Sequence, residues 1–140
     1  MMYLLDTNVV SELRKTKSDK ADRRVRAWTA GVDAGSMFLS AITVLELELG
    51  TLLMECRDSR QGAVLRYWLE HRVLPAFGGR ILVVDIPAAQ RAAALQVPNP
   101  RSYRDSLIAA TALVHGMTVV TRNVKDFAPT GVPVLNPWQA

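Results

Sequence analysis

Four acidic side chains, far apart along the chain, each stand beside the boundary of a predicted element. Asp6 follows residues 3–5, an apolar run that is too short for a helix and predicts a buried strand. Glu46 and Asp105 lie near the starts of two predicted helices, and Asp126 follows a later predicted strand. Parallel strands present their carboxyl ends at one edge of a sheet, where ligands bind in open α/β folds. We therefore expect these carboxylates to converge at that edge.

Carboxylates that converge repel one another, and some of them would have to take up protons unless a cation lies between them. A divalent cation removes this conflict. Mg²⁺ and Mn²⁺ prefer oxygen ligands and keep several waters, so a few carboxylates suffice to hold them. Such a site can activate water and hold a phosphate for in-line attack. The chain has no cluster of cysteines or histidines, which argues against zinc.

Three of the four acids also have a purely structural interpretation. Asp6 could begin a turn or cap the helix that follows it. Glu46 stands three residues after Thr43, which is the spacing of a capping box. Asp126 could cap a short turn. The two interpretations differ in whether the acids come together in space.

Alternating strands and helices must position these residues. The apolar patterns predict strands at 3–5, 37–39, 81–85, 117–120 and 132–135, and helices directly after Asp6 and at 21–32, 44–56, 61–77, 88–95 and 102–115, with a short turn or helix at 124–127. Such alternation favours right-handed crossovers and a mostly parallel sheet. Residues 81–85 resemble a buried strand that is covered on both faces. We expect one α/β/α domain over residues 1–140, with a sheet of about five strands.

Composition narrows the functional classes. With 140 residues, 49% of them hydrophobic and 21% charged, the sequence is typical of one soluble globular domain. No apolar run approaches the roughly 18 residues of a membrane span, and Asp6 comes too early for a secretory signal. The single cysteine excludes an internal disulfide. We expect a cytoplasmic protein with no membrane contact, and its net charge of +4 mildly favours an anionic partner.

Four ordered blocks of the sequence resemble the signature blocks of PIN-domain nucleases. They are Leu-Leu-Asp-Thr-Asn at 4–8, Leu-Glu-Leu at 45–47, Asp-Ser-Leu-Ile-Ala-Ala-Thr-Ala at 105–112 and Thr-Arg-Asn-Val-Lys-Asp-Phe at 121–127. The VapC/FitB-type toxins of bacterial toxin–antitoxin modules are the most similar, including the ending Leu-Asn-Pro-Trp at 135–138. The resemblance runs nearly from end to end. It differs at 97–101, a short proline-containing stretch where relatives often carry a longer polar loop, and Arg104 directly precedes the third acid.

This resemblance implies a PIN fold and an Mg²⁺- or Mn²⁺-dependent endoribonuclease that acts on transfer or ribosomal RNA. It also implies a cognate VapB/FitA-type antitoxin whose C-terminal segment covers the active site. Operator DNA would be bound only through that antitoxin. The expected assembly is a homodimer or a toxin–antitoxin hetero-oligomer.

Carried over by position, the resemblance implies roles for individual residues. Asp6, Glu46 and Asp105 are the core acids and the metal ligands. In the fourth block the family uses an acid at either of two places, which here hold Asn123 and Asp126, and we expect Asp126 to be the fourth catalytic acid. The remaining expected contributors are the supporting residues Thr7, Asn8, Thr121 and Asn123, and Arg122 as a weaker candidate for binding RNA.

Three other interpretations compete with this one. A phosphotransfer enzyme of the haloacid dehalogenase type needs a second Asp where this chain has Asn8. A receiver domain needs paired acids at its first strand, and these are absent, although Asp85 could imitate its phospho-accepting residue. A non-catalytic PIN module would bind nucleic acid or an antitoxin-like protein. The presence of Asp6, Glu46 and Asp105 argues against that module, and metal binding would distinguish it from a nuclease.

Overall fold

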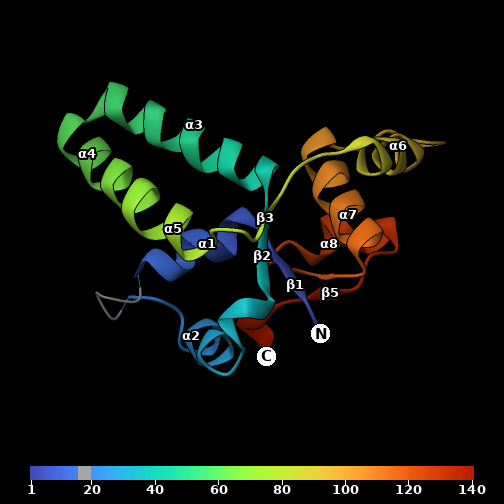
Figure 1. Cartoon of the computed structure of the whole chain (residues 1–140), viewed down its shortest axis with the longest axis horizontal. Coiled ribbons are helices and arrows are strands. Elements are labelled where there is room, and N and C mark those ends of the chain that lie inside the picture. Colours follow the sequence, from blue (N-terminus) through green and yellow to red (C-terminus); the bar gives the residue numbers. More distant parts are fainter. Residues whose placement is uncertain (16–19) are drawn as a thin grey trace.

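A parallel sheet forms the centre of the molecule, with helices on both of its faces (Figure 1). The computed structural model describes residues 1–15 and 20–140. Its strands are β1 (Tyr3–Leu5), β2 (Met37–Ser40), β3 (Ile81–Leu82), β4 (Thr118–Val120) and β5 (Val134–Leu135). They pair in the order β3-β2-β1-β4-β5, and every pair is parallel. The predicted α/β class and strand number are confirmed, and β1 lies at the centre.

Adjacent residues of β1 face the two halves of the core. Leu5 packs with α1 (Thr7–Leu13), α3 (Ala41–Arg57) and the helices that follow α3, whereas Leu4 packs with α7 (Tyr103–His115) and α8 (Val124–Phe127). Both leucines are fully buried. The helices α2 (Arg23–Ala30) and α6 (Ile86–Ala94) complete the two outer layers (Figure 1). Within the described ranges, no helix is long and apolar enough to cross a membrane.

Helices α3 and α4 (Ser59–Trp68) form an antiparallel hairpin that extends away from the sheet (Figure 1). α4 continues through a π-helical segment, Leu69–Val73, into the short α5 (Leu74–Ala76). The two helices of the hairpin approach closely at Gly62, where a Cβ atom would lie 2.5 Å from the Cα of Glu55. Glycine therefore permits the contact that joins the hairpin.

Arg66 links the two helices of this hairpin electrostatically. Its guanidinium lies 2.6 Å from a carboxylate oxygen of Glu48 and 3.0 Å from one of Glu55. A third carboxylate, that of Glu70 on the following turn, lies 3.5 Å away. The hydrogen bond from Arg66 holds the pKa of Glu48 below its ordinary value. The network is partly exposed, so salt and solvent screen it.

We expect Arg66→Ala to lower the Tm by a few degrees at neutral pH, because it leaves three carboxylates close together without their cation. The lowered pKa of Glu48 means that the ion pair stabilises the fold above the ordinary value near 4.5 and loses this effect as the pH falls through the lowered pKa. The gap in Tm between wild type and variant should therefore shrink on acidification. Thermal melts across pH measure it, with Arg60→Ala on the same exposed helix as the control. A gap that does not change with pH would contradict the prediction.

Two local predictions are corrected by the structure. The strand predicted at 81–85 is only two residues long, because β3 is an edge strand that pairs with β2 alone. Val83 is 67% exposed, so the predicted cover on both faces is wrong. The helix predicted at 44–56, with Thr43 before it at cap position, begins at Ala41 instead, and its cap is Ser40, whose hydroxyl accepts a hydrogen bond from the amide of Ile42. Thr43 is therefore an interior, buried residue, and no capping box involves Glu46.

Candidate active site

Asp6 ends the central strand and is fully buried. Its Oδ1 accepts a hydrogen bond from the backbone amide of Thr7 at 2.8 Å, so it is also the cap of α1. Its Oδ2 accepts hydrogen bonds from the hydroxyl of Thr121 at 2.7 Å and from the side-chain amide of Asn8 at 3.3 Å. A buried carboxylate requires such partners. They also hold both oxygens of Asp6 in one orientation.

The residues that support Asp6 are tied to the loop after β4. The hydroxyl of Thr121 accepts a hydrogen bond from the amide of Asn123 at 3.0 Å. The side-chain oxygen of Asn8 accepts one from the amide of Arg122 at 3.3 Å. The structure thus places Asn8 and Thr121 in contact with Asp6 and with the backbone of the fourth block. Asn123 takes part through its backbone, and its own side chain is exposed.

Glu46 and Asp105 approach Asp6 from helices on opposite faces of the sheet. Glu46 Oε1 accepts a hydrogen bond from the hydroxyl of Thr7 at 2.6 Å. Asp105 lies in the first turn of α7, and its backbone amide donates to the capping hydroxyl of Ser102. Burial raises the pKa of Asp105, and the nearby charges of other acids add to this effect. The core acids predicted to converge are therefore brought together.

Arg104 lies between the three acids and donates a hydrogen bond to each of them. Its Nη2 lies 2.6 Å from Asp6 Oδ1, while Nε contacts Glu46 Oε2 and Nη1 contacts Asp105 Oδ1. Burial by itself would lower the pKa of Arg104, but the hydrogen bond to Glu46 and the charges of Asp6 and Glu46 outweigh it and raise that pKa. The sequence places Arg104 beside Asp105 but gives no signal that its guanidinium binds all three acids, because adjacent residues on a helix usually point in different directions.

The donor chemistry of this cluster fits a magnesium or manganese ion. The three acids supply only carboxylate oxygens, and one oxygen of each already contacts a single cationic group. Among residues 1–15 and 20–140, however, no three acidic, histidine or cysteine side chains are arranged to hold a metal ion. The described arrangement instead places the three carboxylates around the guanidinium of Arg104.

The fourth block forms the rim of the site. Asp126 is exposed on α8, which packs against α7, and its charge contributes to the raised pKa of Asp105. The guanidinium of Arg122 lies 5.1 Å from the centre of the Trp138 ring. Arg122, Lys125 and Asp126 line a groove of about 420 Å³. Asp126 does not cap α8 through its side chain, which removes that structural interpretation.

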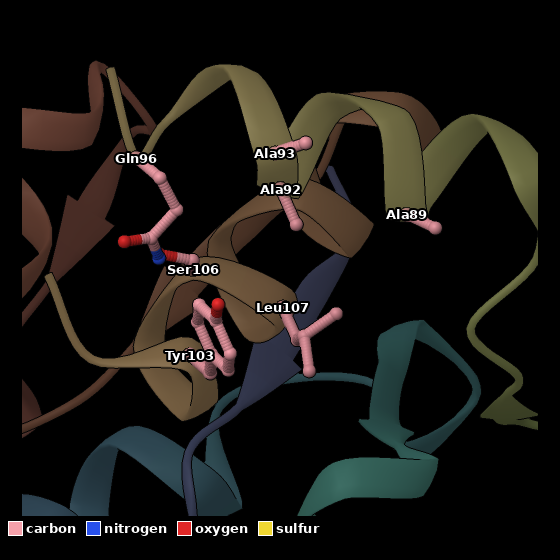
Figure 2. Close-up of a pocket in the computed structure, with 7 residues that line it drawn as sticks. All are labelled: Ala89, Ala92, Ala93, Gln96, Tyr103, Ser106 and Leu107. Carbon is pink, nitrogen blue, oxygen red and sulfur yellow. The ribbon is translucent and has the colours of Figure 1, made fainter. Parts of the chain in front are cut away.

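The structure has two further hollows, of which one is lined by Glu46 and the other by none of the four acids. A groove of about 240 Å³ between α1, α3 and α4 includes Glu46, Thr7 and Trp68 in its wall. A cavity of about 370 Å³ between α6 and α7 contains none of the four acids, and Gln96 donates a hydrogen bond to Ser106 at its end (Figure 2). Grooves therefore lie on both the Glu46 side and the Asp126 side of the cluster.

Comparison with known families gives this arrangement a context. The family model described as PIN domain matches residues 3–131, which includes all four acids. The chain belongs to the PIN-domain family. The match contains the blocks at 4–8, 45–47, 105–112 and 121–127, which supply Asp6, Glu46, Asp105 and Asp126.

Relatives of this PIN-domain protein match it over nearly its whole length. A VapC ribonuclease of Sinorhizobium fredii is 39% identical over 143 residues, covering 99% of each chain. Toxin FitB of Neisseria gonorrhoeae is 40% identical, and the match covers 98% of this chain and 99% of FitB. The crystal structure of FitAcB from the same organism has a TM-score of 0.89 and 39% identity, and the match covers 99% of this chain and 100% of that one. A toxin–antitoxin complex from Klebsiella pneumoniae matches with a TM-score of 0.67 and 28% identity, covering 96% of this chain and 97% of its own.

Proposed function

We propose that this PIN-domain protein is a metal-dependent endoribonuclease toxin of a toxin–antitoxin module, which hydrolyses phosphodiester bonds of transfer or ribosomal RNA. The observation that carries the proposal is the convergence of Asp6, Glu46 and Asp105 from three elements at the carboxyl end of the central strand. The names of the relatives, a VapC ribonuclease and a FitB toxin, support the same conclusion.

In this proposal Asp6 and Asp105 hold Mg²⁺ or Mn²⁺, and Glu46 positions the ion and the attacking water, directly or through a second water. When bound, the ion supplies a water of lowered pKa and offsets the charge that builds on the phosphate. Asp126 is the fourth acid, at the rim. Thr7 and Thr121 keep the carboxylates oriented through their hydroxyl groups.

The RNA backbone is proposed to lie along the groove lined by Arg122 and Lys125. Both cations are exposed next to Asp126, and the chain carries a net charge of +4. Cation–phosphate contacts of this kind weaken with salt, because binding releases counterions from the nucleic acid.

The proposed partner is a VapB/FitA-type antitoxin, through which operator DNA would be bound, and the assembly is a hetero-oligomer in the cytoplasm. The solved toxin–antitoxin complex with this fold supports such a partner. One face of α3 offers an apolar surface for it, because Leu45, Leu49 and Leu53 are each at least 50% exposed at helical spacing.

A second candidate is a non-catalytic PIN module that binds nucleic acid or a protein partner. One observation favours it: the guanidinium of Arg104 already neutralises part of the acidic cluster and contacts the oxygens that a metal would need. Binding of Mn²⁺ by the purified protein distinguishes this module from the nuclease.

We expect purified protein that has been stripped of metal with EDTA to leave RNA intact, and added Mn²⁺ or Mg²⁺ to restore cleavage, because the carboxylates alone cannot lower the pKa of water. The measurement is sequencing of the RNA ends formed from total transfer and ribosomal RNA. Cleavage that continues unchanged in EDTA would contradict the metal requirement. Intact RNA with every metal, together with absent Mn²⁺ binding, would favour the binding module.

A further inference from the structure

We propose that Arg104 is an internal counter-ion that competes with the divalent metal for the carboxylates of the candidate active site, so that the metal binds only when the guanidinium leaves. The proposal rests on the metal-dependent function proposed above. Arg104 directly precedes Asp105 in the sequence.

The contacts of Arg104 use all three nitrogens of its guanidinium, one for each acid. A metal ion would need the same oxygens. Two cationic groups within a few ångströms repel strongly in a partly buried site, so the guanidinium and the ion cannot share them. The acidic cluster therefore binds either the guanidinium of Arg104 or the metal ion, but not both.

The second oxygen of two of these acids is held by neutral donors. Asp6 Oδ2 accepts from the hydroxyl of Thr121, and Glu46 Oε1 accepts from the hydroxyl of Thr7. These hydrogen bonds do not involve Arg104. Departure of the guanidinium would therefore leave both carboxylates oriented toward the position from which it departed.

The guanidinium of Arg104 can also leave the cluster without a change of fold. The side chain of Arg104 is 30% exposed, whereas that of Asp6 is fully buried. A long side chain at the first turn of α7 can rotate into solvent without movement of the helix. The three acids carry more negative charge than one guanidinium neutralises, so a divalent ion is favoured electrostatically once its concentration is sufficient.

The experiment measures Mn²⁺ binding to the full-length, metal-free protein by titration calorimetry and by the electron paramagnetic resonance signal of free Mn²⁺. Arg104→Ala and Arg104→Gln should bind Mn²⁺ more tightly than wild type, on the order of tenfold or more, because the competing cation is gone. Arg104→Gln keeps part of the side chain and a hydrogen-bond donor, so it serves if Arg104→Ala fails to fold.

Arg101→Ala is the matched control, because it removes the same charge just before α7 and Arg101 forms no ion pair with a described residue. Its Mn²⁺ affinity should stay within about twofold of wild type. In EDTA the Tm of Arg104→Ala should be lower than that of wild type, and saturating Mn²⁺ should reverse this loss.

Equal or weaker Mn²⁺ binding by both Arg104 variants, with wild type still binding the ion, would overturn the competition and leave the proposed nuclease intact. Absence of Mn²⁺ binding in wild type and in every variant would overturn both.

Discussion

Asp105→Asn is expected to remain folded and to lose RNA cleavage by on the order of a hundredfold or more, because it removes one negative charge and one metal-binding oxygen from the cluster. Asp105 is the suitable acid for this test. Its side chain is 15% exposed and its carboxylate bonds only to Arg104 among the described residues, so the fold depends little on it. The measurements are cleavage by the purified protein and bacterial growth after induced expression at matched protein levels.

The control is Asp85→Asn, the same substitution at an exposed residue that caps α6 through the amide of Ala88. Asparagine caps helices about as well as aspartate, so activity and stability should stay near wild type. Growth arrest by wild type and Asp85→Asn but not by Asp105→Asn would support a catalytic toxin. Normal cleavage by a folded Asp105→Asn protein would refute the assignment, and arrest by all three would indicate binding or titration of a partner.

Asp6→Asn is a less clean test of the same site. Both oxygens of Asp6 accept hydrogen bonds, so the NH₂ group of asparagine would have to face a donor in a fully buried position. We expect lost cleavage there as well, but together with lower stability.

Gly62→Ala is expected to destabilise the fold by about 1–3 kcal/mol, because its added methyl group meets backbone atoms that cannot move independently. The new Cβ would lie 2.5 Å from the Cα and 2.7 Å from the backbone nitrogen of Glu55. Helices α3 and α4 would have to separate to admit it. Urea denaturation with circular dichroism measures the free energy of unfolding.

The facing helix α3 provides the control, which is the same glycine-to-alanine substitution at an uncrowded position. Gly50 lies inside α3, and nothing stands within 4 Å of the Cβ that Gly50→Ala would add. Alanine should stabilise this helix by about 0.5–1 kcal/mol. Similar effects of the two substitutions, in either direction, would show that the close approach at Gly62 does not determine the stability of the hairpin.

Much of the fold and the place of the acids could be predicted from the sequence, because both depend on local patterns. Residues 3–5 form the expected strand with Asp6 at its end, and the helix predicted at 102–115 ends at His115, just before Gly116 with its φ of 66°. The apolar periodicity of each segment indicates which face of the helix or strand is buried. A parallel sheet then brings the carboxyl ends of its strands to one edge.

Other features depended on contacts between elements that are distant in the chain. The run at 81–85 has the apolar content of a central strand, but strand order placed it at the edge of the sheet. Glu46 stood at capping-box spacing from Thr43, yet its partners are Thr7 and Arg104, which come from other elements.

Arg104 illustrates why such contacts cannot be predicted from local spacing. Spacing along a helix predicts the direction of the Cα–Cβ bond, but the guanidinium of a long, flexible arginine moves to the nearest uncompensated negative charge. The gathering of acids at the carboxyl end of β1 follows from local patterns in the chain. The position of Arg104 among them follows from the fold, because it depends on the distances between three separately placed carboxylates.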